Sequence, residues 1–178
     1  MDDLASIERR AARIKLLLMD CDGVLTDGRL WLTEDGDEQK RFNTHDGQGL
    51  SLLHRAGLKS GIITGRSSKA VMRRAAELGV EFVRQGDPDK IAAFEQLLQQ
   101  AGVTENEVAF IGDDLPDIPI MKRAELAVAV ADAVEETRAV AHYVTLAKGG
   151  QGAVREVVEL ILKSQGRWHD LVDEYLKQ

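Results

Sequence analysis

Two aspartates, Asp20 and Asp22, directly follow an apolar run and precede a glycine, Gly23. The run, Leu16 to Met19 with Ile14 two positions earlier, predicts a strand buried on both faces, as parallel strands are. In open α/β sheets, ligands bind at the edge where such strands end. Two carboxylates this close repel each other unless a cation or a shared proton lies between them. The pattern therefore indicates a divalent metal beside a carboxylate that is free to attack, although Asp and Gly also favour plain turns.

Three later segments supply polar residues in similar positions. Thr64, Lys90 and Asp113 each follow a segment with strand character, and Asp117 lies four residues after Asp113. Lys90 stands in the first turn of a predicted helix, where a cation opposes the helix dipole, which favours a functional role. Phosphoryl transfer needs few parts, chiefly a nucleophile, a metal, and donors that hold the oxygens as charge shifts. The set predicts a phosphoryl-transfer site.

Each part of that chemistry has a candidate residue. Asp20 is the candidate nucleophile, which would form an aspartyl phosphate. Asp22 can protonate the departing alkoxide and later take a proton from the hydrolytic water. Thr64 offers a hydroxyl to a phosphoryl oxygen, and Lys90 neutralises charge on the nucleophile and the phosphate. Mg²⁺ suits an all-oxygen site, here the side chains of Asp20 and Asp113 with the backbone carbonyl of Asp22.

The elements that must position these residues alternate between strand and helix. Strand-length apolar runs are followed by helical patterns that end at a glycine, as at Gly57, Gly79 and Gly102, and Pro88 falls near the first turn of one helix. Such alternation predicts an α/β fold, a doubly wound and mostly parallel Rossmann-like sheet, in a single domain over residues 1–178. After the first strand we expect strands at 59–63, 81–84, 108–111, 126–130 and 143–144, and helices at 47–56, 69–78, 88–101, 118–124, 134–141 and 153–163.

One insertion interrupts this alternation. Segments 29–33 and 39–43 flank a polar turn with a central glycine, which predicts a β-hairpin over about residues 28–43. An isolated two-stranded ribbon is barely stable in water. Because the hairpin is expected to expose several apolar side chains near one another, we expect it to pack against another subunit. Those side chains are Leu30, Trp31, Leu32 and Phe42.

Composition narrows the class of protein. The 178 residues are 44% hydrophobic and 30% charged, as expected for one soluble domain with a sizeable core, and the net charge of -7 argues against nucleic-acid binding. The single cysteine, Cys21, points into the core by strand alternation and favours a reducing compartment. No apolar run approaches the ~18 residues of a membrane span. We expect a cytoplasmic protein whose tail, 165–178, is either a peripheral helix or an arm that reaches another subunit.

Taken together, the motifs resemble those of the haloacid dehalogenase superfamily of phosphatases, in their order and spacing. The matching segments are Asp-Cys-Asp-Gly-Val at 20–24, Ile-Thr-Gly-Arg at 63–66, Lys90, and Gly-Asp-Asp-Leu-Pro-Asp at 112–117. The resemblance implies the haloacid dehalogenase fold and a phosphoric monoester hydrolase.

More narrowly, residues from about 14 to 164 resemble the capless 3-deoxy-D-manno-octulosonate 8-phosphate phosphatases of lipopolysaccharide synthesis. This resemblance implies a magnesium-dependent homotetramer without a cap domain, in which the hairpin joins neighbouring subunits. It rests on Asp-Gly-Val-Leu-Thr-Asp-Gly at 22–28, Phe-Asn-Thr-His-Asp-Gly-Gln-Gly at 42–49, Val-Ala-Val-Ala-Asp-Ala at 128–133, Tyr-Val-Thr at 143–145 and Gly-Gly-Gln-Gly-Ala-Val-Arg-Glu-Val at 149–157.

The same resemblance implies which residues contact a sugar-acid phosphate. Cations are expected among them because the ligand is anionic, and Arg suits a planar carboxylate. Ser51 departs from the family, since relatives place a basic residue there. The implied contact residues are Asp22, Asn43, Thr44, His45, Asp46, Gly47, Gly65, Arg66, Arg74 and Lys90.

Other functions use similar residues. A nonulosonate 9-phosphate is an alternative substrate, because spacing does not measure a pocket. A receiver-like signalling module also places acids, Thr and Lys around magnesium, but it needs an acceptor Asp at the end of a central strand, and the strand 59–63 ends in Thr64. Some relatives are non-catalytic tetramerising domains, and the retention of Asp20, Asp22, Lys90 and Asp113 argues against that role here.

Overall fold

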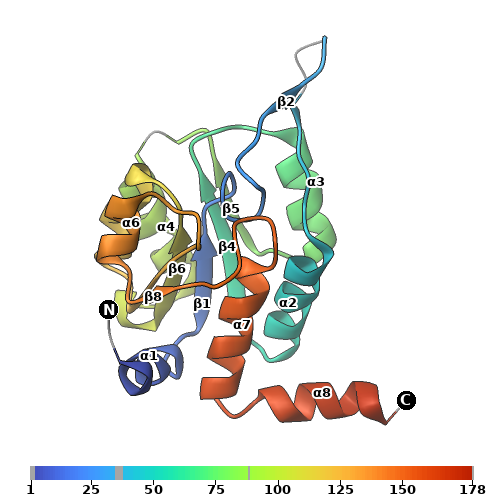
Figure 1. The fold of residues 1–178 in the computed structure, drawn as a ribbon, viewed down its shortest axis with the longest axis vertical. Coiled ribbons are helices and arrows are strands. Elements are labelled where there is room, and N and C mark those ends of the chain that lie inside the picture. The colour runs from blue at the N-terminus through green and yellow to red at the C-terminus, as the bar shows by residue number, and fades with distance from the viewer. Residues whose placement is uncertain (1–2, 35–37, 88, 178) are drawn as a thin grey trace.

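A six-stranded parallel sheet forms the centre of the computed structural model, which describes residues 3–34, 38–87 and 89–177 (Figure 1). The strand order is β5-β4-β1-β6-β7-β8, with neighbours parallel throughout. The predicted doubly wound sheet is therefore confirmed. The strands are β1 (Leu16–Met19), β4 (Lys59–Thr64), β5 (Phe82–Gln85), β6 (Val108–Gly112), β7 (Leu126–Ala129) and β8 (Tyr143–Val144).

Strand β1 lies between β4 and β6, and its register sets the position of the chemistry. All four residues of β1 are fully buried, as predicted for a strand covered on both faces. Met19 pairs with Ile62 of β4 and with Ile111 of β6. Because the three strands are parallel and in register, they end at the same edge of the sheet. The residues that follow them therefore lie together at that edge.

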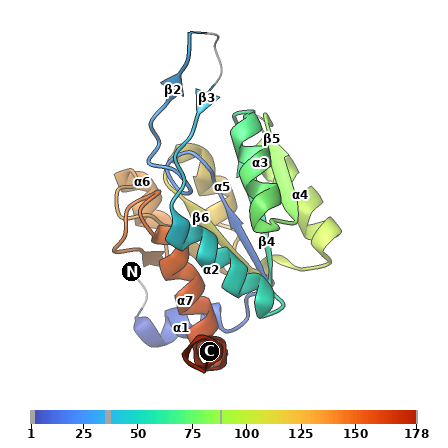
Figure 2. The same cartoon turned by 90° about the vertical axis from the view of Figure 1, so that its right-hand side faces the viewer.

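Helices cover both faces of the sheet. On one face α2 packs against α7 and α7 against α1, which Figure 2 shows side by side, and on the other face α4 and α5 contact β4 and β6. The helices are α1 (Leu4–Ala11), α2 (Thr44–Arg55), α3 (Lys69–Leu78), α4 (Lys90–Ala101), α5 (Ile118–Met121), α6 (Glu135–Val140), α7 (Ala153–Ser164) and α8 (Trp168–Leu176), with 3-10 turns at η1 (Glu105–Glu107) and η2 (Leu115–Asp117).

Helix ends follow the expected capping chemistry. Helices α3 and α4 end at Gly79 and Gly102, both with φ of 68°, as their C-cap glycines predict. Helix α2 begins three residues before the expected Gly47, because Asn43 Oδ1 accepts the His45 N–H at 2.8 Å and caps the helix. The expectation for Pro88 lies outside the described residues.

The hairpin extends from the end of the molecule at which β1 ends (Figure 1). Strands β2 (Trp31–Leu32) and β3 (Glu38–Gln39) pair antiparallel over two residues each, and part of the predicted turn lies outside the described residues. Trp31 is 50% and Leu32 67% exposed, as predicted, whereas Phe42 is half-buried against the core. The predicted apolar surface is therefore confined to the outer part of the hairpin.

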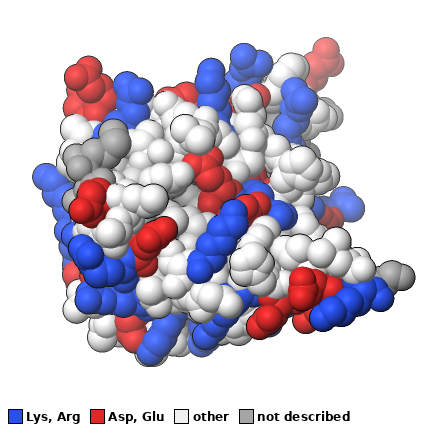
Figure 3. Space-filling view, turned by 60° about the horizontal axis from the view of Figure 1, so that its bottom comes forward, with Lys and Arg blue, Asp and Glu red and all other residues white. Residues whose placement is uncertain are grey.

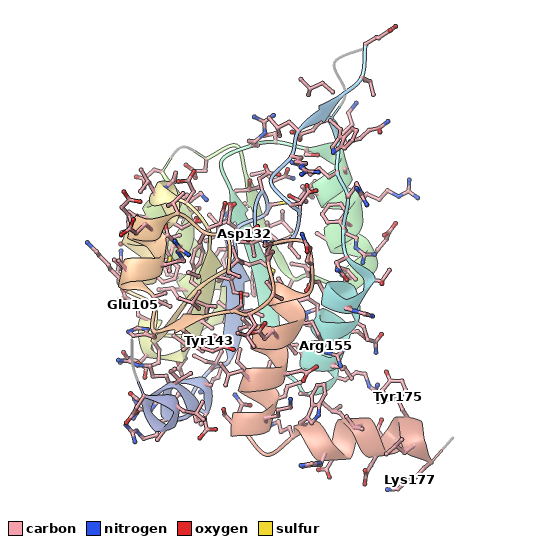
Figure 4. All side chains as sticks on the ribbon, viewed as in Figure 1. Glu105, Asp132, Tyr143, Arg155, Tyr175 and Lys177 are labelled. Carbon is pink, nitrogen blue, oxygen red and sulfur yellow. The ribbon has the colours of Figure 1, made fainter. Side chains whose placement is uncertain are left out.

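The C-terminal segment forms α8 at the end of the molecule opposite the hairpin (Figure 1). Leu171 is buried, and Tyr175 extends toward α2, where its hydroxyl accepts hydrogen bonds from Gln48 Nε2 at 2.8 Å and Arg55 Nη1 at 2.7 Å (Figure 4). Figure 3 shows acidic and basic side chains interspersed over the face that includes this helix. Residues 168–176 thus form a helix on the surface of the chain, and the alternative of an arm that reaches another subunit stays a prediction.

Among the described residues, one hydrophobic core cluster extends from Ile7 to Leu171. None of the described helices has both the length and the apolar character that crossing a bilayer requires.

Candidate active site at the carboxyl edge of the sheet

A pocket of about 360 Å³ lies at the edge where β1, β4 and β6 end. It gathers residues from four separate segments, including most of those predicted to do chemistry. Its lining residues are Asp20, Asp22, Thr64, Gly65, Arg66, Asp87, Lys90, Asp113, Asp114, Pro116 and Asp117.

Lys90 links the end of β1 to the loop after β6. Its Nζ donates to Asp20 Oδ1 at 2.8 Å and to Asp117 Oδ1 at 2.7 Å. The other oxygen of Asp117 accepts the backbone N–H groups of Asp113 at 3.0 Å and Asp114 at 3.4 Å. Lys90 reaches this position because it is the first residue of α4, whose N-cap Asp89 fixes the entry of the chain.

Asp117 was given no role of its own from the sequence. It is 1% exposed, and both of its oxygens are occupied by Lys90 and by the loop of Asp113. It therefore braces the site as well as lining it. Its spacing from Asp114 was the available signal, because the two form a capping box at η2.

The carboxylates at this edge carry more negative charge than the lysine offsets. Burial raises the pKa of Asp20 to about 6, with Asp117 adding to the rise and Lys90 opposing it. Burial, followed by the charge of Asp20, raises the pKa of Asp113 to about 8. Each acid disfavours ionisation of the next, which is the condition that a bound cation relieves.

The residues present fit Mg²⁺. Carboxylate oxygens of Asp20, Asp113 and Asp117 lie within 4.8 Å of one another, and hard oxygens are the ligands that this ion prefers. Gly23 has φ of 98°, and a Cβ there would stand 2.0 Å from Asp113 Oδ2. Only glycine lets the turn after β1 approach Asp113 this closely.

Asp22 belongs to a second charged group, which the sequence pattern did not predict. Lys40 Nζ donates to Asp22 Oδ1 and lies 3.1 Å from Glu38 Oε2. Glu38 Oε1 accepts from Arg66 Nη2 at 2.9 Å and from Arg66 Nε at 3.2 Å. Burial is the largest single influence and would lower the pKa of Lys40, but the hydrogen bonds and charges of Asp22 and Glu38 together outweigh it, and the pKa lies above its usual value. Glu38 and Lys40 stand two residues apart, so strand alternation was the signal that could have paired them.

A glycine-rich loop supports the turn that carries Asp22. Gly150 N donates to Val24 O at 2.9 Å, and a Cβ on Gly149 would stand 1.7 Å from Gly23 O. Asp132, labelled in Figure 4, accepts the Gly149 N–H at 3.0 Å and holds the loop in place. The two backbones touch directly, which explains why glycines stand at 149 and 150.

The remaining predicted contact residues lie outside this pocket. Asp46 is buried, and its carboxylate accepts the N–H groups of Gly152 at 3.3 Å and Arg155 at 2.9 Å, which caps α7. Asn43 lines a neighbouring polar pocket of about 370 Å³, and Arg74 packs over the Phe42 ring. Thr44 and His45 are exposed, and Gly47 is buried in α2.

Neither Cys21 nor Ser51 lines the 360 Å³ pocket. Cys21 is buried, as strand alternation predicts, and burial raises the pKa of its thiol. Ser51, the position that departs from the family pattern, lies half-buried in α2, away from the residues that line the 360 Å³ pocket.

The amino-acid sequence is similar to those of known phosphatases, which agrees with the phosphoryl-transfer residues gathered in the pocket. Residues 80–157 match the haloacid dehalogenase-like hydrolase family. A 3-deoxy-D-manno-octulosonate 8-phosphate phosphatase of Yersinia pestis is 46% identical over 89% of this chain and 85% of its own length. The chain belongs to this phosphatase family. The corresponding octulosonate phosphatase of Escherichia coli K12 is 43% identical over 92% of the chain and 87% of that protein.

Solved structures of octulosonate phosphatases and their relatives share the fold. A probable YrbI family phosphatase from Pseudomonas syringae superposes with a TM-score of 0.95 at 46% identity, covering 97% of this chain and 98% of that one. The octulosonate phosphatase of Moraxella catarrhalis, solved with magnesium, phosphate and KDO, superposes with a TM-score of 0.95 at 43% identity. The match covers 97% of this chain and 99% of that one. The family resemblance stated from the motifs is confirmed.

Proposed function

We propose that this chain is a magnesium-dependent phosphatase that hydrolyses 3-deoxy-D-manno-octulosonate 8-phosphate to the free sugar acid and phosphate in lipopolysaccharide biosynthesis. The relatives named above carry this activity in their names, and one was solved with magnesium, phosphate and KDO. The observation that supports it most is the convergence of Asp20, Lys90 and Asp113 on one pocket.

The first step we propose is phosphoryl transfer to Asp20. Its carboxylate attacks phosphorus, the bond to the sugar oxygen breaks, and an aspartyl phosphate forms. Asp22 gives its proton to the departing alkoxide, which leaves as the sugar hydroxyl. Lys90, already 2.8 Å from Asp20, offsets negative charge on the nucleophile and the transferred group.

The second step is hydrolysis of the aspartyl phosphate. Asp22, now ionised, takes a proton from water as the water attacks phosphorus. The P–O bond to Asp20 breaks, and Asp20 and inorganic phosphate are released. Thr64 is 3% exposed and lines the pocket, so its hydroxyl is available to a phosphoryl oxygen.

Mg²⁺ would be held by the carboxylates of Asp20 and Asp113 and by the backbone carbonyl of Asp22. When bound, it supplies positive charge against the phosphoryl oxygens.

For the sugar acid we propose contacts in two groups. Gly65 and Arg66 line the pocket, and the Arg66 side chain is 50% exposed, which leaves it room to turn toward an anion. Arg74 and the segment Asn43, Thr44, His45, Asp46 and Gly47 form the second group, with Asp46 acting through α7 rather than by touching substrate.

We also propose that one domain spans the chain, that four copies associate through their hairpins, and that the enzyme works in the cytoplasm. The continuous core supports the single domain. Exposure of Leu30, Trp31 and Leu32 supports association. The single cysteine, Cys21, suits a reducing compartment.

The test is phosphate release by the purified chain from the octulosonate 8-phosphate and from a nonulosonate 9-phosphate, with magnesium and with excess chelator. We expect the octulosonate ester to be the better substrate and turnover to need magnesium. Asp20→Asn should lose about 10³-fold or more in kcat. The control Asp170→Asn, on the exposed side of α8, should match the parent chain.

Each opposite outcome has a definite meaning. Undiminished turnover by Asp20→Asn would refute the nucleophile. Faster release from the nonulosonate ester would reassign the substrate. A folded protein without turnover would favour a tetramerising domain, or a receiver-like module if intact mass shows a persistent phosphoryl group.

A further inference from the structure

The side chain of Lys40 is almost completely covered at this edge of the sheet, and the mechanism above gives it no task. Its side chain is 2% exposed. Taking an ammonium group out of water costs several kcal/mol unless it is fully paired. A hairpin base that needed only packing would be served as well by an apolar side chain, so the pairing of Lys40 is the feature to explain.

Both partners of Lys40 are carboxylates, and they have different neighbours. Nζ donates to Asp22 Oδ1 and lies 3.1 Å from Glu38 Oε2. Glu38 in turn accepts two hydrogen bonds from Arg66. The hairpin thus provides two residues, Glu38 and Lys40, whose contacts end on Asp22 and Arg66, and both of these line the pocket.

The two oxygens of Asp22 are not equivalent. Oδ1 is held by Lys40, whereas Oδ2 is buried and has no hydrogen-bond partner among the described residues. Arg66 Nε lies 3.8 Å from Oδ2, beyond hydrogen-bond distance. Asp22 therefore has one anchored oxygen and one oxygen left for a group that enters the pocket.

Lys40 itself does not meet that group. It is absent from the residues that line the pocket, and its Nζ is taken up by Asp22 and Glu38. Its effect on the reaction passes through one of these two carboxylates, and Asp22 is the one that handles the proton in the proposed mechanism.

We propose that Lys40 is a positioning residue: it anchors Oδ1 of Asp22 so that Oδ2 faces the oxygen of the leaving alcohol. The proposal rests on the phosphatase function proposed above and extends it to the hairpin. Removal of Lys40 frees the Asp22 carboxylate to rotate, so the proton is no longer delivered in line with the bond that breaks. The expected loss is a fraction of the 10²-fold to 10⁴-fold that a positioned acid contributes.

The test compares leaving groups. A sugar alkoxide needs a proton as it departs, whereas the nitrophenolate of p-nitrophenyl phosphate leaves without one. In the first turnover, Lys40→Met should slow release of the sugar acid by about tenfold or more and slow release of nitrophenolate by less than about threefold. The first turnover is used because Asp22 also takes part in the later hydrolysis of the aspartyl phosphate.

A double-mutant cycle identifies the route of the effect. On the sugar acid phosphate, Asp22→Asn with Lys40→Met should be within about twofold of Asp22→Asn alone, since the lysine acts through that carboxylate. Lys40→Arg, which keeps a charged donor, should recover most of the rate lost in Lys40→Met. Lys122→Met, which removes an exposed lysine after α5, is the matched control and should change nothing.

Equal losses on both substrates, or a full additional loss in the Asp22→Asn background, would overturn the proposal. So would a Lys40→Met protein that turns over sugar acid phosphate like the parent chain. If the parent chain itself fails on every sugar phosphate with magnesium, the phosphatase function is what has failed. Thermal midpoints of all variants, together with Lys40→Arg, distinguish loss of folding from loss of positioning.

Discussion

At the scale of single residues, Asp117 shows how a site depends on a carboxylate whose oxygens are already paired with other parts of the chain. One of its oxygens holds Lys90 and the other holds the backbone of the Asp113 loop. The lysine and the loop come from different parts of the chain, so this carboxylate sets the distance between them.

We predict that Asp117→Asn lowers kcat about tenfold or more and lowers the free energy of unfolding by about 1–3 kcal/mol, because an amide cannot accept from both Lys90 and the loop. Steady-state kinetics and urea denaturation measure the two effects. Asp170→Asn is the control for loss of an aspartate charge. Unchanged values for Asp117→Asn would show that the brace is not needed.

His54 predicts a pH dependence of stability away from the pocket. Burial lowers its pKa below the usual 6.5, against the opposing effects of the Leu78 backbone and Glu81, and its Nε2 lies 2.7 Å from Ser60 Oγ. The unfolded chain therefore binds a proton more readily, so His54 stabilises the fold above about pH 6.5 and this contribution is lost as the pH falls below that value.

As the pH falls from about 7.5 to about 5.5, we expect the thermal midpoint of His54→Gln to rise relative to that of the parent chain, since the glutamine does not titrate. The raised pKa values of Asp20 and Asp113 act in the opposite direction to His54 and affect both proteins alike. Scanning calorimetry at the two pH values measures the difference, and equal changes in both proteins would show that His54 does not contribute.

The nucleophile, the metal ligands and Lys90 could be proposed from the sequence because each follows a strand, and parallel strands end together. Lys40 and Asp117 could not be assigned in the same way. Their partners are distant in the chain, and each contact depends on the direction in which a side chain points. Spacing in the sequence does not predict such a contact, as between Lys40 and Asp22.

At the scale of elements, the loop before α7 and the start of α2 hold each other in place. Asp46, from the first turn of α2, caps α7 through Gly152 and Arg155. A helix N-terminus is usually capped by its own preceding residue, so a cap from another helix couples the two.

Asp46→Ala should therefore reduce the free energy of unfolding by about 1–2 kcal/mol, the usual cost of a lost cap. Asp46→Asn keeps one acceptor oxygen and should cost less. Chemical denaturation followed by circular dichroism measures both, and equal stability of the alanine variant and the parent chain would contradict the capping role.

The elements themselves were largely predictable. Strand β1 and helices α3 and α4 were expected at nearly their observed bounds, because their apolar periodicity and terminal glycines agree. The predicted start of helix α2, Gly47, was three residues later than the observed start, because the cap formed by Asn43 was not considered. Phe42 was expected to be exposed, but contact with the core and with Arg74 outweighs its place in the hairpin.

At the scale of the whole molecule, the outer part of the hairpin exposes apolar side chains that nothing in a single chain covers, among the described residues. Leu30, Trp31 and Leu32 are each about half exposed or more, and contiguous apolar surface of this kind marks an interaction site.

We predict that Trp31→Asp shifts the protein from tetramers toward smaller species at micromolar concentration, because a buried unpaired carboxylate disfavours the interface. Light scattering after size-exclusion chromatography gives the mass. Leu4→Asp, at an exposed leucine of α1, is the matched control. A tetramer that survives Trp31→Asp unchanged would place the interface elsewhere.

The hairpin faces two ways: Trp31 points to solvent on its outer part, while Lys40 at its base lies on Asp22. A neighbouring copy that binds the outer part of the hairpin would also hold Lys40, at the base of the hairpin, in position. Turnover per molecule would then decline on dilution below the dissociation threshold of the assembly, and crosslinking the copies would preserve it.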